Sequence, residues 1–128
     1  MTANENQLFS EFAKEIFLTD LELDPQRATY LGLHEYDGRV PEVSEAGYNK
    51  QATVYRDILN RLKSFDRNEL SLENKYDYDI AEWGLSSSLF NLEELKSHKL
   101  NPMTYAFMFG DLHNYISRDY APFEERIE

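Results

Sequence analysis

The chain contains no cysteine, a single tryptophan, few glycines and prolines, and no long apolar run. The absence of cysteine excludes disulfide bonds, thiolate metal ligands and a cysteine nucleophile within these residues, and it is compatible with a reducing cytosol. The N-terminus lacks the basic and apolar regions of a secretory signal. Since no stretch approaches the roughly 20 apolar residues that cross a bilayer, we expect a cytoplasmic protein without a membrane partner.

Basic residues are also scarce, with 13 Lys and Arg against 24 Asp and Glu and a formal net charge of -11. Such a chain repels phosphate backbones and anionic lipids, whereas nucleic-acid binders need clustered Lys and Arg. We therefore expect no nucleic-acid partner. The hydrophobic content of 41% and the aromatic content of 14% are typical of globular proteins. The chain is long enough to bury roughly two thirds of its unfolded surface in one domain.

The apolar periodicity predicts helices separated by short polar segments, because no segment shows the sustained alternation of apolar and polar residues that is typical of a strand. A first helix is predicted to present one apolar side, which contains Leu8, Phe9, Phe12, Ala13, Ile16 and Phe17. A second, short helix should begin with Asp24 as its N-cap and Pro25 at its first position, and stop near Gly32. Asp37-Gly38 then favours a turn.

Longer helices are predicted after this turn. Ser44 is the expected N-cap of a helix whose apolar side contains Tyr48, Ala52, Tyr55, Ile58, Leu59, Leu62 and Phe65. Ser71 should begin another helix that runs to about Ser97, and a fifth is indicated by Tyr105, Phe109, Leu112 and Ile116. Ala121-Pro122 opens a sixth helix that is cut after one turn, which we interpret as a sign of a fragment. We predict an all-α fold, a bundle of about five helices in one domain over residues 1–128, truncated at its C-terminal end.

The helix predicted from residue 72 carries two apolar stripes and should therefore be the most buried. One stripe contains Leu72, Tyr76, Ile80, Trp83, Ser87 and Phe90, and the other contains Tyr78, Ala81, Leu85, Leu89 and Leu92. The small residues from Gly84 to Ser88 favour the close approach of another helix. These serines lack the Gly-x-Ser-x-Gly surroundings of a hydrolase nucleophile.

His34 and Glu35 look like the start of a zinc-peptidase motif, but that motif needs a second histidine where this chain has Gly38 in a turn. Two interpretations of His34, Glu35 and Tyr36 stay open. They are either polar groups at a helix end that bind a carbonyl or water, or substrate-binding groups that face a cleft of a complete protein.

The remaining titratable groups form no recognisable catalytic pattern. His98 and His113 lack a second histidine or a carboxylate pattern for a three-ligand metal site. Asp77, Asp79 and Glu82 form either a solvated acidic face or, with groups from other elements, a cation or acid–base site. We predict no catalytic residue, no metal ligand and no cofactor within this chain.

The passage from Leu21 to Glu35, in which an Asp-Pro helix start runs into Leu-Gly-Leu-His, resembles the opening of the prokaryotic domain-of-unknown-function family eight-eight-five. Residues 118–127 likewise resemble a segment that leads into a longer helix in that family. Members are usually several times longer and look like helical zinc metallopeptidases with a distant His-Glu-x-x-His helix. The resemblance implies that this chain is the N-terminal region of such a zinc-dependent hydrolase, which shapes or covers the substrate channel and is not catalytic by itself.

The same resemblance implies the partners. They are the remainder of the chain's own polypeptide and, in the full-length protein, zinc and a peptide substrate. Apolar surface meant for that remainder should drive self-association of the isolated region.

Two alternatives come from other classes of protein. One is a stand-alone acidic helical module that binds another protein through an aromatic and methionine surface, made of Met103, Tyr105, Phe107, Met108, Phe109, Tyr115 and Tyr120. The other is a small metal- or ligand-binding bundle that uses Asp77, Asp79 and Glu82.

Overall fold

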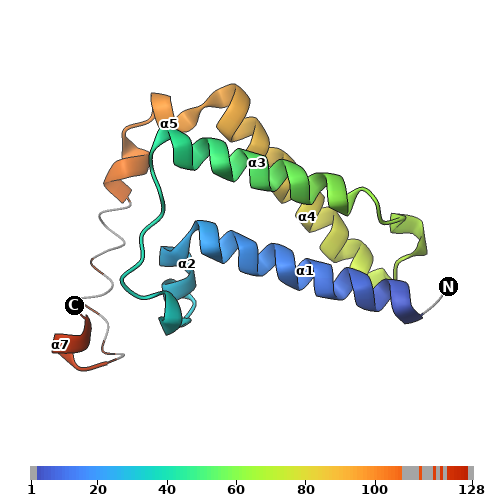
Figure 1. Ribbon diagram of the computed structural model, residues 1–128, viewed down its shortest axis with the longest axis horizontal. Coiled ribbons are helices and arrows are strands. Elements are labelled where there is room, and N and C mark those ends of the chain that lie inside the picture. Colours follow the sequence, from blue (N-terminus) through green and yellow to red (C-terminus); the bar gives the residue numbers. More distant parts are fainter. Residues whose placement is uncertain (1–2, 108–112, 114–116, 118, 120, 127–128) are drawn as a thin grey trace. The chain divides into compact units, whose positions relative to one another are not determined.

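The computed structural model describes residues 3–107, 113, 117, 119 and 121–126 (Figure 1). Among these residues it has six bounded α-helices and no strand, which confirms the all-α prediction. The helices are α1 (Ala3–Leu23), α2 (Pro25–Tyr30), α3 (Glu45–Leu62), α4 (Leu72–Phe90), α5 (Ser97–Leu100) and α7 (Phe123–Arg126). Residues 103–107 are helical as well. Short 3-10 helices form η1 (His34–Tyr36) and η2 (Arg67–Glu69), and η3 (Asn91–Leu95) is a π-helix.

The chain divides into two compact units. The first unit comprises Met1–Asp20 and Glu42–Leu95, and therefore holds most of α1 with α3 and α4. The second comprises Leu21–Pro41 and Lys96–Glu128, with α2, η1, α5 and α7. The division shows which residues pack together and does not test whether the two units form one domain. The prediction of a single domain therefore stays a prediction.

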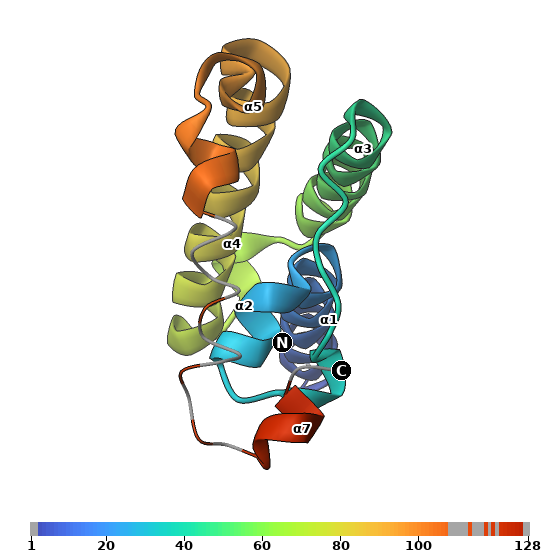
Figure 2. The same cartoon turned by 90° about the vertical axis from the view of Figure 1, so that its left-hand side faces the viewer.

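Figures 1 and 2 show the three long helices α1, α3 and α4, and in the first unit side chains of α1 contact residues of both α3 and α4. Residues further along α1 meet residues earlier in α3: Tyr55 Oη donates a 2.7 Å hydrogen bond to Asp20, while the guanidinium of Arg61 donates bonds of 2.6 and 2.7 Å to Glu15. The two helices are therefore antiparallel. The side chain of Asn74 donates to the backbone oxygen of Asn6 at 3.0 Å, near the start of both α4 and α1.

Aromatic rings form the centre of this unit. Phe9 of α1 is completely buried, and its ring lies edge-on to Phe65 with centroids 5.3 Å apart. Phe9 also stacks with Tyr78 of α4, with ring centroids 6.2 Å apart. Phe12, one turn further along α1, also stacks on Phe65. Phe9 of α1 therefore contacts both α4 and the segment that follows α3.

Helix starts follow the sequence prediction closely. The side chains of Asp24, Ser44 and Ser71 each accept a hydrogen bond from the backbone N–H three residues later, at 3.3, 3.0 and 3.3 Å. Pro25 occupies the first turn of α2, as expected. These contacts satisfy amide groups that have no partner inside the helix.

The helix after Ser71 differs from the prediction in two respects. It ends as an α-helix at Phe90 and continues as the π-helix η3, and Lys96 then turns the chain with a φ of +51°. It is also not uniformly buried, which corrects our expectation. The close helix approach predicted at Gly84 is not confirmed either, because a Cβ at that position would meet no atom within 4 Å.

The second unit has its own small core. Leu21, Ala28 and Tyr36 are buried together, and Leu33 packs against them. Near α5, Tyr105 Oη donates a 2.9 Å hydrogen bond to the backbone oxygen of His98. Most of the predicted fifth helix, including Phe109, Leu112 and Ile116, lies outside the described residues, as do Met108, Tyr115 and Tyr120 of the aromatic and methionine surface.

Candidate functional site

The segment His34–Tyr36 forms a single 3-10 turn between two glycines. Gly32 and Gly38 have φ values of +88° and +75°, a region that residues with a side chain rarely adopt. Gly32 ends the segment that follows α2, and Gly38 belongs to the turn predicted at Asp37-Gly38. As a result His34 and Glu35 are exposed, whereas Tyr36 points into the core of the second unit.

Tyr36 is held by two charged neighbours. The guanidinium carbon of Arg39 lies 5.0 Å from the centre of the Tyr36 ring, within the range of a cation–π interaction. Burial raises the pKa of the Tyr36 hydroxyl, and a hydrogen bond with Glu22 raises it further. The Tyr36 hydroxyl is therefore held in its neutral, protonated form near neutral pH.

Glu22 and Arg39 complete this Glu22–Tyr36–Arg39 cluster. Two guanidinium nitrogens of Arg39 donate to the two carboxylate oxygens of Glu22, at 2.6 and 3.3 Å. These bonds lower the pKa of the Glu22 carboxyl below its ordinary value. Both side chains are about half exposed. No pattern in the sequence indicated this pair, because Glu22 lies on α1 and Arg39 lies 17 positions later, after η1.

The residues of the turn do not fit a zinc site. His34 Nδ1 lies 3.0 Å from Asp37 Oδ2, so the imidazole is already engaged by a neighbouring carboxylate. The residue four positions after His34 is Gly38, which offers no ligand. Within the described part of the chain, no three His, Asp or Glu side chains gather closely enough to hold a metal ion. The other oxygen of Asp37 is buried without a hydrogen-bond partner among the described residues.

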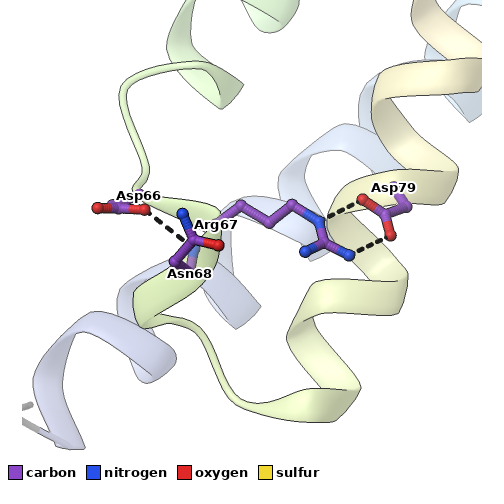
Figure 3. Close-up of polar contacts among 4 residues, drawn as sticks. All are labelled: Asp66, Arg67, Asn68 and Asp79. Atoms are coloured by element: carbon purple, nitrogen blue, oxygen red, sulfur yellow. Dashed lines mark hydrogen bonds and ion pairs between the residues drawn. The ribbon is translucent and has the colours of Figure 1, made fainter.

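The acidic group on α4 is organised by a nearby arginine (Figure 3). Arg67 donates from Nε and Nη2 to the two oxygens of Asp79, at 2.5 and 2.6 Å. Asp66 caps η2 by accepting a 2.9 Å bond from the N–H of Asn68, which fixes the turn that carries Arg67. Hydrogen bonding to Arg67 lowers the pKa of Asp79. Asp79 therefore belongs to a surface ion pair, and among the described residues Asp77, Asp79 and Glu82 do not gather into a shared set of metal ligands.

An exposed apolar row runs along α4, and we call it the α4 stripe. Its large members are between 60% and 74% exposed: Leu72, Tyr76, Ile80, Trp83 and Phe90. The core-facing residues Tyr78, Leu85 and Leu89 lie on nearly the opposite side of the helix and are buried. The predicted burial of both stripes fails because the other helices of the first unit contact only one side of α4.

Substituting Arg39 with Gln is expected to raise the pKa of the Glu22 carboxyl toward its ordinary value of 4.5. Arg39→Lys should restore only part of the shift, since lysine keeps the charge but loses the two-point hydrogen bond. Because the folded pKa lies below the unfolded one, the pair stabilises fully above about pH 4.5, and its contribution is lost as the pH falls through the folded pKa. NMR titration of the carboxyl carbon measures both variants. An unchanged pKa in Arg39→Gln would contradict the assignment.

Among the described residues, the fold and these contacts define an all-α protein with several exposed ion pairs and with a row of exposed apolar side chains on α4. The chain belongs to the family described as "Bacterial protein of unknown function (DUF885)", whose model matches residues 25–128. This match confirms the family that the sequence resembled. No curated protein and no solved structure matches the chain. None of the helices among the described residues is long and apolar enough to cross a membrane.

Proposed function

We propose that this chain is the N-terminal helical region of a zinc-dependent peptidase-like hydrolase, and that it shapes or covers the substrate channel without supplying a catalytic residue. The single observation that carries the proposal is the α4 stripe. A row of large apolar side chains on a folded helix is the kind of surface that further polypeptide covers. Family membership supports the coarser statement that this chain is part of a bacterial protein of unknown function.

In this proposal the zinc and its ligands belong to further polypeptide of the same protein. His34 and Glu35 contribute at the channel, because they are exposed on a turn that two glycines and Asp37 hold in place. Tyr36 contributes indirectly, since its burial against Arg39 fixes the turn. Exposed polar groups on a rigid turn position a substrate more readily than they transfer protons. We also propose a cytoplasmic location, which the absence of cysteine supports.

The reading frame beyond codon 128 tests this proposal most directly. We expect continuous coding that includes a His-Glu-x-x-His motif, and a stop codon directly after codon 128 would overturn the proposal. In the longer gene product, His→Ala at the first position of that motif should abolish hydrolysis of unstructured peptides.

Steady-state kinetics of the same gene product distinguish a role of this region in substrate binding from a role in catalysis. His34→Ala and Glu35→Ala should raise KM several-fold and leave kcat within about twofold, because they remove binding and not transition-state contacts. Glu124→Ala, which removes an exposed carboxylate elsewhere in the second unit, should change neither constant. A large fall in kcat in either turn variant would assign catalysis to this chain and contradict the proposal.

The second candidate is a stand-alone acidic interaction module. The exposure of Met103 and Phe107, at 49% and 67%, favours it, because exposed aromatic and methionine side chains mark protein interfaces. A stop codon after codon 128 together with a specific protein partner lost in Phe107→Asp would establish this candidate in place of the first.

A further inference from the structure

Asp37 and Gly38 form the only place in the chain where a glycine follows an aspartate or an asparagine. A glycine leaves its own backbone nitrogen unshielded by a side chain, so this nitrogen can approach the carboxyl carbon of the preceding residue closely. The other aspartates are followed by larger residues, as Asp20 is by Leu21. Asp37 is therefore the aspartate at which the sequence most favours closure of a five-membered succinimide ring.

The backbone nitrogen of Gly38 is accessible in the folded turn. Gly38 is exposed, and a Cβ built on it would meet no atom within 4 Å. The amides of Asp37 and Arg39, on either side, donate to backbone oxygens of the turn at 3.1 and 3.2 Å. The Gly38 amide, by contrast, donates to no group in the described part of the chain. Its nitrogen can therefore approach the carboxyl without the loss of a hydrogen bond.

The carboxyl of Asp37 is restrained. Its Oδ2 lies 3.0 Å from His34 Nδ1, and the side chain is 27% exposed. Ring closure needs the Gly38 nitrogen to eclipse the Cβ of Asp37 about the Cα–C bond, and a ψ of 144° at Asp37 keeps the two far from eclipsed. The contact with His34 therefore opposes the rotation that ring closure needs.

We infer that Asp37-Gly38 is a site of isoaspartate formation, and that the contact with His34 slows this reaction. In the first step the Gly38 nitrogen bonds to Cγ of Asp37, and the proton of that nitrogen leaves with the carboxyl hydroxyl as water. In the second step water opens the succinimide. Attack at the main-chain carbonyl carbon breaks its bond to nitrogen and gives isoaspartate, whereas attack at Cγ restores aspartate. Only water is exchanged, and the inference does not rest on the proposed function.

The modification has a direct structural consequence for the turn. Isoaspartate routes the main chain through Cβ and Cγ and lengthens it by one carbon. The 3.2 Å hydrogen bond from the Arg39 amide to the Tyr36 oxygen spans the modified residue. The same short segment positions the Arg39 guanidinium on Glu22 and over the Tyr36 ring. Isoaspartate should therefore disrupt the Glu22–Tyr36–Arg39 cluster and loosen the turn that carries His34 and Glu35.

Ageing of the purified 128-residue chain at neutral pH and physiological temperature tests the inference. The probe is an isoaspartate methyltransferase with radiolabelled S-adenosylmethionine, which labels isoaspartyl carboxyl groups, and peptide mapping locates the label. We expect label at residue 37 to accumulate with time. Asp20 and Asp57, which precede leucine and isoleucine, should stay unlabelled and serve as internal controls. In the aged chain the pKa of the Glu22 carboxyl should move toward its ordinary value.

Variants of the turn test the role assigned to His34. His34→Ala should form isoaspartate about two- to tenfold faster than the parent chain, which is the range of one hydrogen bond. His34→Gln keeps a side-chain N–H donor and should stay closer to the parent rate. The matched control Glu35→Ala removes a neighbouring exposed side chain and should leave the rate unchanged. Circular dichroism checks that each variant is folded.

Gly38→Asn tests the nitrogen that attacks. Asparagine places a side chain beside this nitrogen and hinders its approach, and it tolerates the positive φ at this position better than most residues with a side chain. The variant should therefore lose the label at residue 37. Retention of the parent rate would contradict attack by this nitrogen.

Two further outcomes would overturn the inference. No label at residue 37 in either the parent chain or His34→Ala would remove the modification site. A rate in His34→Ala equal to or below that of the parent would remove the protective role of His34. Both outcomes leave the proposed function standing, whereas a stop codon after codon 128 overturns the proposed function and leaves the chemistry of this turn unchanged.

Discussion

Phe9→Ala is expected to lower the free energy of unfolding by about 3–5 kcal/mol, as is typical for removal of a buried phenylalanine. Phe9 is completely buried and contacts both Phe65 and Tyr78. Its removal leaves a cavity among rings that belong to three different segments. Since helices of this length depend on tertiary packing more than on their own propensity, the loss should weaken the attachment of α1 to the rest of the first unit. Urea unfolding followed by circular dichroism measures the change.

Phe17→Ala is the matched control on the same helix. Phe17 was predicted to share the apolar side of α1 with Phe9, but it is 45% exposed. Its truncation should cost less than about 1 kcal/mol. Equal losses in the two variants would mean that Phe17 is as well packed as Phe9, and would contradict the assignment of the core.

Gly47→Ala is expected to lower the free energy of unfolding by about 1–3 kcal/mol, although alanine is the better helix former. A Cβ at this position would collide with the carbonyl oxygen of Glu42 and come within 2.8 Å of the Glu42 Cγ. The backbone at Glu42 cannot move aside freely, because the Glu42 side chain accepts a 2.8 Å bond from Ser44, the residue that caps α3. Relief of the collision should therefore disturb the cap.

Gly84→Ala should have the opposite sign. Gly84 lies in the middle of α4, and a Cβ there would meet no atom within 4 Å. The substitution should raise the free energy of unfolding by up to about 1 kcal/mol through helix propensity alone. Thermal unfolding of both alanine variants beside the parent chain measures the difference, and a stabilising Gly47→Ala would show that the approach of Glu42 is not tight.

Features encoded by neighbouring residues could be predicted from the sequence. The caps at Asp24, Ser44 and Ser71 depend on a side chain and an amide three residues away. Most of the buried side of α3 was also predicted correctly, since Ala52, Tyr55, Ile58, Leu59 and Leu62 follow one regular period and are all buried. Tyr48 and Phe65, predicted for the same side, are only partly buried, and Phe65 lies beyond the end of α3. In each case the relevant contacts follow from helix geometry alone.

Features that depend on which elements meet could not be predicted. The period identified both apolar stripes of α4, but it carries no information on how many neighbours the helix has, so the exposure of Trp83 and Ile80 was missed. At the candidate site, the sequence placed His34, Glu35 and Tyr36 on a loop but could not show that Tyr36 turns inward onto Leu21 and Ala28. Nor could it pair Arg39 with Glu22. The substrate-binding role of the turn stays a prediction.

The antiparallel contacts of α1 have a consequence for the order in which the chain folds during synthesis. The ring partners of Phe9 are Phe65 and Tyr78, and the second of these is translated 69 residues later. Translation proceeds at about 5–20 residues per second, so Tyr78 is made about 3–14 s after Phe9 on the apolar side of α1. Residues of α3 and α4 meet across a short connection, so their hairpin closes quickly once translated. The first helix to be made can therefore contact α3 and Phe65 early, but it completes its core only after α4 has been translated, and until then part of its apolar side is open to chaperones.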